Sequence, residues 1–208
     1  MNTHTFWHLR WVEGRIGWHE ASGNALLQKH WRSNGRRVLV PLCGKSADMI
    51  WLAQQGNAVV GVELSPIGVD AFFAENELNF EQRNDVYRAT DLDITIHLGD
   101  YFGFDDEPFD ALYDRAALVA LPAEFRAEYV RKTNALLAPD SELLVVTFEY
   151  DQSRVEGPPY SVPDDEVRSY WPALEKLESR NEIDNSAPKF REAGFTEVTE
   201  TVWRSRRD

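Results

Sequence analysis

The chain has 208 residues, of which 43% are hydrophobic, and this length favours one folded domain with a substantial core. Its 35 acidic residues outnumber its 22 basic residues and give a formal net charge of −13, which repels phosphate backbones and anionic membranes. The composition therefore argues against nucleic acid or a membrane surface as a partner.

The first 36 residues stand apart from the pattern that follows. They contain four of the chain's seven tryptophans, Trp7, Trp11, Trp18 and Trp31. This N-terminal arm can pack its aromatic rings onto the outer helices of a sheet, or it can fold over the open end of the sheet. An aromatic face over a sulfonium cation gains cation–π attraction. We predict that the arm is a lid.

Apolar runs of strand length then alternate with segments of helical spacing. Ser65 is expected to cap a helix that starts at Pro66. The expected strands cover residues 37–41, 58–63, 94–98, 109–113 and 143–148, and the expected helices cover 46–55, 66–78 and a segment opened by Pro122. Apolar strands that alternate with helices indicate a parallel sheet covered on both faces.

The last quarter of the chain differs from the alternating pattern. A loop with Gly157-Pro158-Pro159 precedes an expected helix at 164–171. Expected strands at 174–180 and 196–203 flank a short helix at 187–193. The sequence therefore predicts a single α/β domain with a seven-stranded sheet.

Four expected strands end in residues that suit a nucleoside, and open α/β sheets bind ligands beyond the carboxyl ends of their strands. Gly44 lets the backbone approach a ligand closely, and Glu63, about twenty residues later, can accept hydrogen bonds from both hydroxyls of a ribose. Asp100 and Tyr101 suit the amino group and ring of adenine. Arg115 brings a cation to the reaction centre. Either acid alone could simply mark the point where a strand ends and its side chain reaches water. The spacing of Glu63 and Asp100 behind the glycine turn favours a nucleoside site.

The turn after the first strand excludes two other cofactor classes. A phosphate-binding loop needs a second glycine where Leu39 stands, and a nicotinamide enzyme needs three glycines in this turn. One glycine suits a cofactor without phosphates, such as S-adenosylmethionine. We interpret Cys43, the only cysteine, as a small buried side chain. The five histidines and this cysteine lack metal-site spacing, so we expect no metal.

Three features of the sequence bear on the cellular compartment of the protein. No apolar run approaches the roughly 20 residues that span a bilayer, and residues 1–10 lack the apolar stretch of a signal peptide. A single cysteine excludes an internal disulfide and fits a reducing compartment. These features predict a soluble, cytoplasmic protein, and its acidic surface favours a monomer.

Five segments together resemble the thiopurine S-methyltransferase family, in its compact bacterial form. They are WHLRWVEGRIGWHE (7–20), VLVPLCGKSADM (38–49), VVGVELS (59–65), YDRAALVALP (113–122) and FEYDQSRVEGPPYSV (148–162). The resemblance runs over nearly the whole chain and in the same order. It implies a Rossmann-like class I methyltransferase fold with an antiparallel last strand.

The resemblance also implies the site. The cofactor S-adenosylmethionine would contact Trp11, Leu42, Glu63 and Arg115, with Trp7, Asp100 and Tyr101 as neighbours, and Gly44 joins this set from the turn after the first strand. The acceptor would contact Trp18, Arg115, Pro158 and Pro159. Family members differ at the position of Asp100. The division that follows is an arm at 1–36, a cofactor-binding core at 37–150, and an acceptor loop with C-terminal strands at 151–208.

The implied activity is methylation of aromatic and heterocyclic thiols, thiopurines included, with selenium or tellurium species as further acceptors. Arg115 is the expected catalytic residue, where it would stabilise or orient an anionic acceptor. Its structural alternative is a salt bridge to Asp114 or Glu149. A non-enzymatic alternative for the whole chain is a sensor domain that keeps the nucleoside pocket without chemistry.

Overall fold

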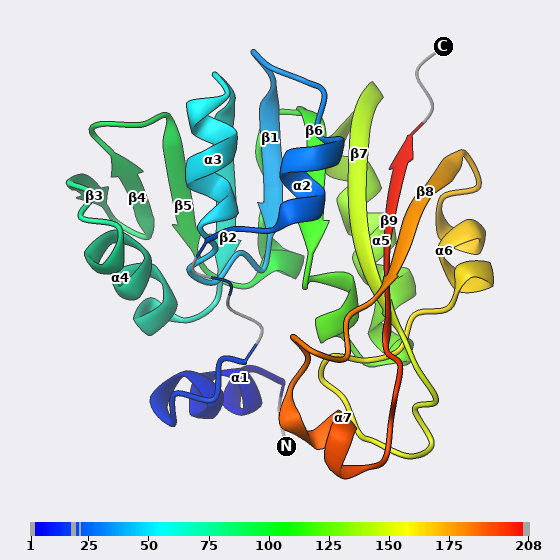
Figure 1. Cartoon of the computed structure of the whole chain (residues 1–208). Helices are drawn as coiled ribbons and strands as arrows, with labels where there is room; N and C mark the ends of the chain where they lie inside the picture. The colour runs from blue at the N-terminus through cyan, green and yellow to red at the C-terminus, as the bar shows by residue number, and fades with distance from the viewer. Residues whose placement is uncertain (1–2, 18–19, 21, 206–208) are drawn as a thin grey trace. The chain divides into compact units, whose positions relative to one another are not determined.

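The computed structural model describes residues 3–17, 20 and 22–205. The chain divides into two compact units, one that ends at Ala111 and one that begins at Leu112. Figure 1 labels their helices and strands. The single-domain expectation and its division into arm, core and acceptor loop stay predictions. No helix in the described part of the chain is long and apolar enough to cross a membrane.

The first unit is built on a sheet in the order β3-β4-β5-β2-β1. Its strands are β1 (Arg37–Pro41), β2 (Ala58–Glu63), β3 (Phe80–Arg83), β4 (Val86–Ala89) and β5 (Ile94–Leu98). Its helices are α1 (Thr3–Val12), α2 (Ala25–His30), α3 (Asp48–Gln54) and α4 (Pro66–Glu75), with a 3-10 turn η1 (Tyr101–Gly103). β1, β2 and β5 are parallel, whereas β3 and β4 form an antiparallel hairpin beside β5.

The hairpin β3–β4 was not expected from the sequence. All four residues of β3 are exposed, and β4 alternates between buried and exposed side chains, so neither is an apolar run. With this hairpin the described residues contain nine strands, and the expectation of seven was too low.

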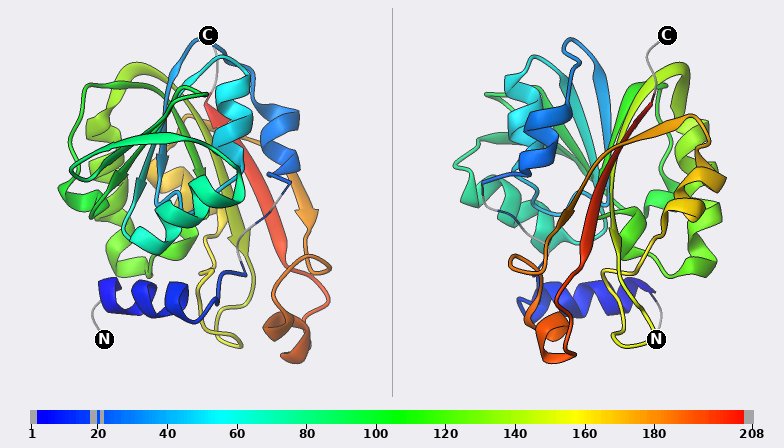
Figure 2. Two further views of the ribbon diagram at one scale, coloured as in Figure 1. Left: turned by 90° about the vertical axis from the view of Figure 1, so that its left-hand side faces the viewer. Right: turned by 45° about the vertical axis from the view of Figure 1, so that its right-hand side comes forward.

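The helices of the first unit are placed by close packing. α3 and α4 both contact β2 and β5. At Gly61 in β2, a Cβ atom would lie 2.6 Å from Cys43 Sγ and 2.9 Å from Met49 Sδ. α1 contacts α4 and lies beyond the carboxyl ends of these strands (Figure 2).

The second unit begins inside β6 (Phe109–Arg115), the strand that crosses the boundary between the units. Its strands lie in the order β7-β9-β8, with both pairs antiparallel. They are β7 (Leu137–Glu149), β8 (Leu174–Asn181) and β9 (Thr199–Ser205). Its helices are α5 (Ala123–Leu136), α6 (Asp164–Tyr170) and α7 (Pro188–Glu192), with a 3-10 turn η2 (Leu118–Ala120). The prediction of an antiparallel last strand is confirmed.

Most expected elements of the second unit form close to their predicted limits. β9 starts at Thr199, three residues later than expected, and β7 starts at Leu137, six residues before the predicted start at residue 143. An aromatic cluster of Tyr150, Phe190 and Phe195 packs α7 near the end of β7.

We predict that Gly61→Ala lowers the free energy of unfolding by about 1–3 kcal/mol, because the new methyl overpacks the contact with Cys43 and Met49. Urea unfolding measures this. Gly99→Ala is the matched control, since nothing lies within 4 Å of a Cβ atom there. The double variant Gly61→Ala/Cys43→Ala should recover part of the loss, and equal losses for Gly61→Ala and Gly99→Ala would contradict the packing argument.

Candidate functional site

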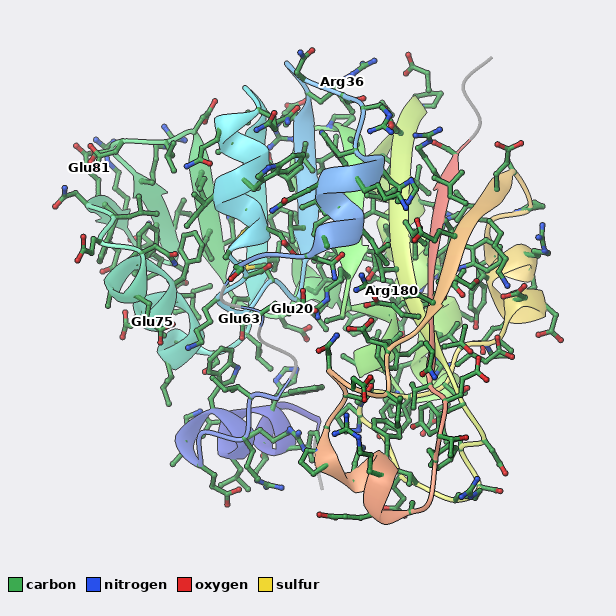
Figure 3. All side chains as sticks on the ribbon, in the orientation of Figure 1. Glu20, Arg36, Glu63, Glu75, Glu81 and Arg180 are labelled. Atoms are coloured by element: carbon green, nitrogen blue, oxygen red, sulfur yellow. The ribbon has the colours of Figure 1, made fainter. Side chains whose placement is uncertain are left out.

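Glu63 lies at the carboxyl end of β2, where its side chain is labelled in Figure 3. Its Oε2 accepts a hydrogen bond from the Gly44 N–H at 2.8 Å, and its Oε1 accepts one from the Ser65 N–H at 2.7 Å. The Leu64 N–H and the Trp11 side chain also donate to it. Backbone and indole donors therefore fix the orientation of this carboxylate.

Burial raises the pKa of Glu63 from its ordinary 4.5 to about 7, because the charged form loses its hydration. The hydrogen bonds from Ser65, Gly44, Leu64 and Trp11 oppose this shift by stabilising the charge. Both protonation states of this carboxyl are therefore populated near neutral pH.

The helix α1 is fastened at two points to the carboxyl end of the sheet in the first unit. Trp11, which is buried, donates to Glu63 at the end of β2. His4 Nε2 lies 3.3 Å from Asp100 Oδ2, just after β5. Trp7 is half-buried in the same helix. Trp18, expected to contact the acceptor, lies outside the described residues, and the lid stays a prediction.

The turn after β1 contains Leu42, Cys43, Gly44 and Lys45, and it is held by contacts within the first unit. Leu42 and Gly44 both have positive φ, 48° and 54°. The Lys45 ammonium donates to both carboxylate oxygens of Glu75 at 2.6 and 2.7 Å, so this lysine is already paired. Burial and the nearby Glu63 charge raise the pKa of the Cys43 thiol well above its usual range, which keeps it protonated and fits its interpretation as a buried side chain.

Two residues expected at the adenine have structural contacts. Asp100 Oδ1 accepts a hydrogen bond from the Phe102 N–H at 3.0 Å and so starts the turn η1. Tyr101 is buried. Their contact with adenine stays a prediction.

Ser65 departs from its predicted role. It occupies the position before α4 with extended backbone, but its side chain makes no capping hydrogen bond. Its hydroxyl is buried and has no hydrogen-bond partner in the described part of the chain. Ser65 follows Glu63 by two residues in the sequence.

In the second unit, Asp114 organises the segment that carries Arg115. Its carboxylate accepts hydrogen bonds from the Tyr129 hydroxyl at 2.8 Å and from the N–H groups of Ala117 and Leu118 at 3.2 and 3.1 Å. Burial raises the pKa of Asp114 from its ordinary 3.8 to about 6. Ala116, with φ at 80°, makes the turn that these bonds hold.

Arg115 interacts electrostatically with Glu200 of β9, a partner that sequence reasoning did not suggest. Glu200 is buried and binds Arg180 of β8 with a nitrogen–oxygen distance of 2.7 Å. Figure 3 labels Arg180 on this strand. Glu200 was missed because its strand neighbours gave no sign of a buried charge.

The structure brings the loop that contains Pro158 and Pro159 next to the segment after Arg115. The Tyr160 N–H donates to the Val119 carbonyl at 2.7 Å, and Val119 belongs to η2. The Tyr150 hydroxyl and the Lys189 ammonium hold the carbonyls of Pro159 and Pro158 at 2.7 and 2.9 Å. Three of the four expected acceptor residues therefore lie in neighbouring segments of one unit.

A cavity of about 280 Å³ lies elsewhere in the first unit. Gly61 in β2 faces α3. Because side chains alternate along a strand, Val60, which lines the cavity, lies on the opposite face of the sheet from α3. Its polar lining includes Arg37 and Asp106, which pair at 2.6 Å, together with Arg88 and His97. None of the residues expected at the cofactor lines this cavity.

The residues that the structure describes hold no cluster of three or more potential metal ligands.

The family profile described as Thiopurine S-methyltransferase (TPMT) matches residues 2–208. The chain belongs to the thiopurine S-methyltransferase family. A thiopurine S-methyltransferase of Photobacterium profundum is 42% identical over 207 residues, covering 95% of this chain and 96% of the relative. One from Pseudomonas putida is 44% identical over 211 residues, covering 95% and 96%.

Solved structures show the fold. A Burkholderia thailandensis 1,6-didemethyltoxoflavin-N1-methyltransferase, with S-adenosylhomocysteine bound, has a TM-score of 0.62 at 17% identity and covers 98% of this chain and 87% of that one. The magnesium protoporphyrin IX methyltransferase of Synechocystis has a TM-score of 0.60 at 15% identity, with 88% and 80% covered. The predicted class I methyltransferase fold, a mostly parallel core with antiparallel C-terminal strands, is confirmed.

We predict that Tyr129→Phe lowers the free energy of unfolding by about 1–3 kcal/mol, because Asp114 loses a hydrogen-bond donor inside the protein. The folded pKa of Asp114 lies above its ordinary value, so stability from this group is present below about pH 4 and is lost as pH rises through about 6. The hydroxyl stabilises the charged form, so the loss should be larger at pH 8 than at pH 4. Urea unfolding at both values checks this, and a pH-independent loss would contradict it.

Proposed function

We propose that this protein transfers a methyl group from S-adenosylmethionine to the sulfur of an aromatic or heterocyclic thiol, thiopurines included. The observation that carries the proposal is the family match over residues 2–208, with relatives at 42% and 44% identity that are named thiopurine S-methyltransferases. Selenium and tellurium species are soft nucleophiles of the same kind and are included as acceptors.

The first unit offers groups that fit the cofactor. Glu63 is a buried carboxylate of fixed orientation, suited to the ribose hydroxyls, and the Ser65 hydroxyl is a buried polar atom with no recorded partner among the described residues. Trp11 places an aromatic ring beside them, and Trp7, Leu42, Gly44, Asp100 and Tyr101 complete the proposed set. S-adenosylmethionine supplies the methyl group as a sulfonium cation and leaves as a neutral thioether.

The second unit offers groups that fit the acceptor. Arg115 would orient an anionic sulfur, and Pro158 and Pro159 would contact its ring, with Trp18 as the fourth acceptor residue. An aromatic thiol is partly ionised near neutral pH, so the reaction requires no strong general base. Alignment of donor and acceptor can lower the barrier by about 7–11 kcal/mol. We further propose that the enzyme acts as a monomer in the cytoplasm.

Calorimetric titration with S-adenosylmethionine, followed by a methyl-transfer assay on a thiopurine in the same sample, tests the proposal. Binding with turnover is the expected result. Binding without turnover across a panel of thiols and selenols would favour a sensor domain. Absence of binding would refute the proposed cofactor.

We predict that the dissociation constant for S-adenosylmethionine rises about tenfold between pH 8 and pH 6, because a carboxyl with a pKa of about 7 is then mostly protonated and accepts hydrogen bonds less well. Glu63→Ala should weaken binding at both values. Glu63→Gln keeps the shape but removes the titration, so its weaker binding should be insensitive to pH in this range. A similar pH response in the Gln variant would assign the titration to another group.

We predict that Arg115→Ala lowers kcat at least tenfold in a normally folded protein, and that Arg115→Lys recovers part of it, since lysine keeps the charge without the planar fork. Melting temperature and steady-state kinetics separate this from a structural role through Glu200. A large loss of melting temperature with unchanged kcat would favour the structural role.

A further inference from the structure

Gly68 is the third residue of α4, and it is buried. Its backbone lies outside the left-handed region that favours glycine, so an L-residue is compatible with its conformation. Alanine is the better helix former at such a position. Neither the backbone nor helix propensity therefore accounts for a glycine here.

The space beside Gly68 does account for it. A Cβ atom on Gly68 would lie 2.9 Å from Cζ2 and 3.2 Å from Cε2 of the Trp11 indole, and 3.3 Å from Cγ of Glu63. Real Cβ atoms do not approach heavy atoms as closely as 2.9 Å, so the indole would have to move. Gly68 thus touches both partners of the hydrogen bond between α1 and β2.

We propose that Gly68 is a positioning residue for cofactor binding. Its missing side chain lets the Trp11 indole lie against α4 and donate its N–H to Glu63, which sets the position of α1 at the carboxyl end of β2. This inference deepens the proposed function and rests on it for the identity of the cofactor.

The contact tolerates little displacement. An indole is rigid and has only two side-chain torsions, so it cannot fold away from a methyl group while keeping its N–H on the carboxylate. Toward the other end of α1, His4 Nε2 lies 3.3 Å from Asp100 Oδ2, an exposed contact that adds little to the position of the helix. A methyl on Gly68 should therefore break the Trp11–Glu63 hydrogen bond, and a hydrogen bond to a charged group is among the stronger ones.

The first test is Gly68→Ala, with binding measured by calorimetry and activity with a thiopurine. We expect the dissociation constant and the KM for S-adenosylmethionine to rise about tenfold, because the displaced Trp11 is itself one of the proposed cofactor contacts. At saturating cofactor, kcat should change less than about twofold. Asp70→Ala is the matched control, because it also introduces alanine into α4 but replaces an exposed side chain. Unchanged binding in Gly68→Ala would overturn the proposal.

The second test needs no cofactor. On a Trp11→Ala background the obstructing indole is gone, so Gly68→Ala should raise the melting temperature by about 2–4 °C through helix propensity. With Trp11 present, the same substitution should lower the melting temperature or leave it unchanged. An equal rise on both backgrounds would overturn the proposal. A wild-type protein that fails to bind S-adenosylmethionine would refute the proposed function instead. The melting temperatures on the two backgrounds would still show whether Gly68 makes room for the Trp11 indole.

Discussion

The first unit depends on a carboxylate that is buried at the end of a strand. Removing the Glu63 charge from water costs several kcal/mol unless donors surround it. The N–H groups of Gly44 and Ser65 each donate to one of its two oxygens, which ties the turn after β1 to the start of α4. Leu42 adopts left-handed backbone in that turn, which is strained for a residue other than glycine, and such strain persists only where surrounding contacts impose it. The geometry of this strand end is thus a consequence of satisfying one charge.

The second unit repeats the arrangement with different residues. Asp114 is also buried near a strand end, also receives two N–H groups from the segment that follows, and stands two residues before Ala116, which has positive φ. The Tyr129 hydroxyl takes the place that the indole takes at Glu63. In both cases burial raises the pKa of the acid and hydrogen bonds oppose the rise. Arg115 is the next residue along the chain, so the buried acid positions a segment whose own cation remains partly accessible.

Sequence patterns predicted those elements that bury apolar side chains on a regular period. The parallel strands were found because they are apolar throughout, whereas β3 was missed because its residues, Phe80 to Arg83, are all exposed and its stability comes from pairing with β4. Glu63 was predicted at the cofactor because its spacing behind a glycine turn, together with Asp100, favours a nucleoside site, and its contact with the cofactor stays a prediction. Glu200 and the role of Gly68 could not be found, because each depends on which distant residue packs against it. The resemblance named Trp11 but gave no reason for its position.

Trp11 gives the N-terminal arm two contacts within the first unit. Its ring packs against Gly68 in α4 while its N–H donates to Glu63, so one side chain joins the arm to both the core and the proposed site. An N–H group binds a carboxylate more strongly than a neutral carboxyl. Protonation of Glu63 therefore weakens its hold on α1 and its capacity to accept hydroxyl groups together. A single proton, exchanged near pH 7, would therefore change both the attachment of α1 to β2 and the acceptor strength of Glu63.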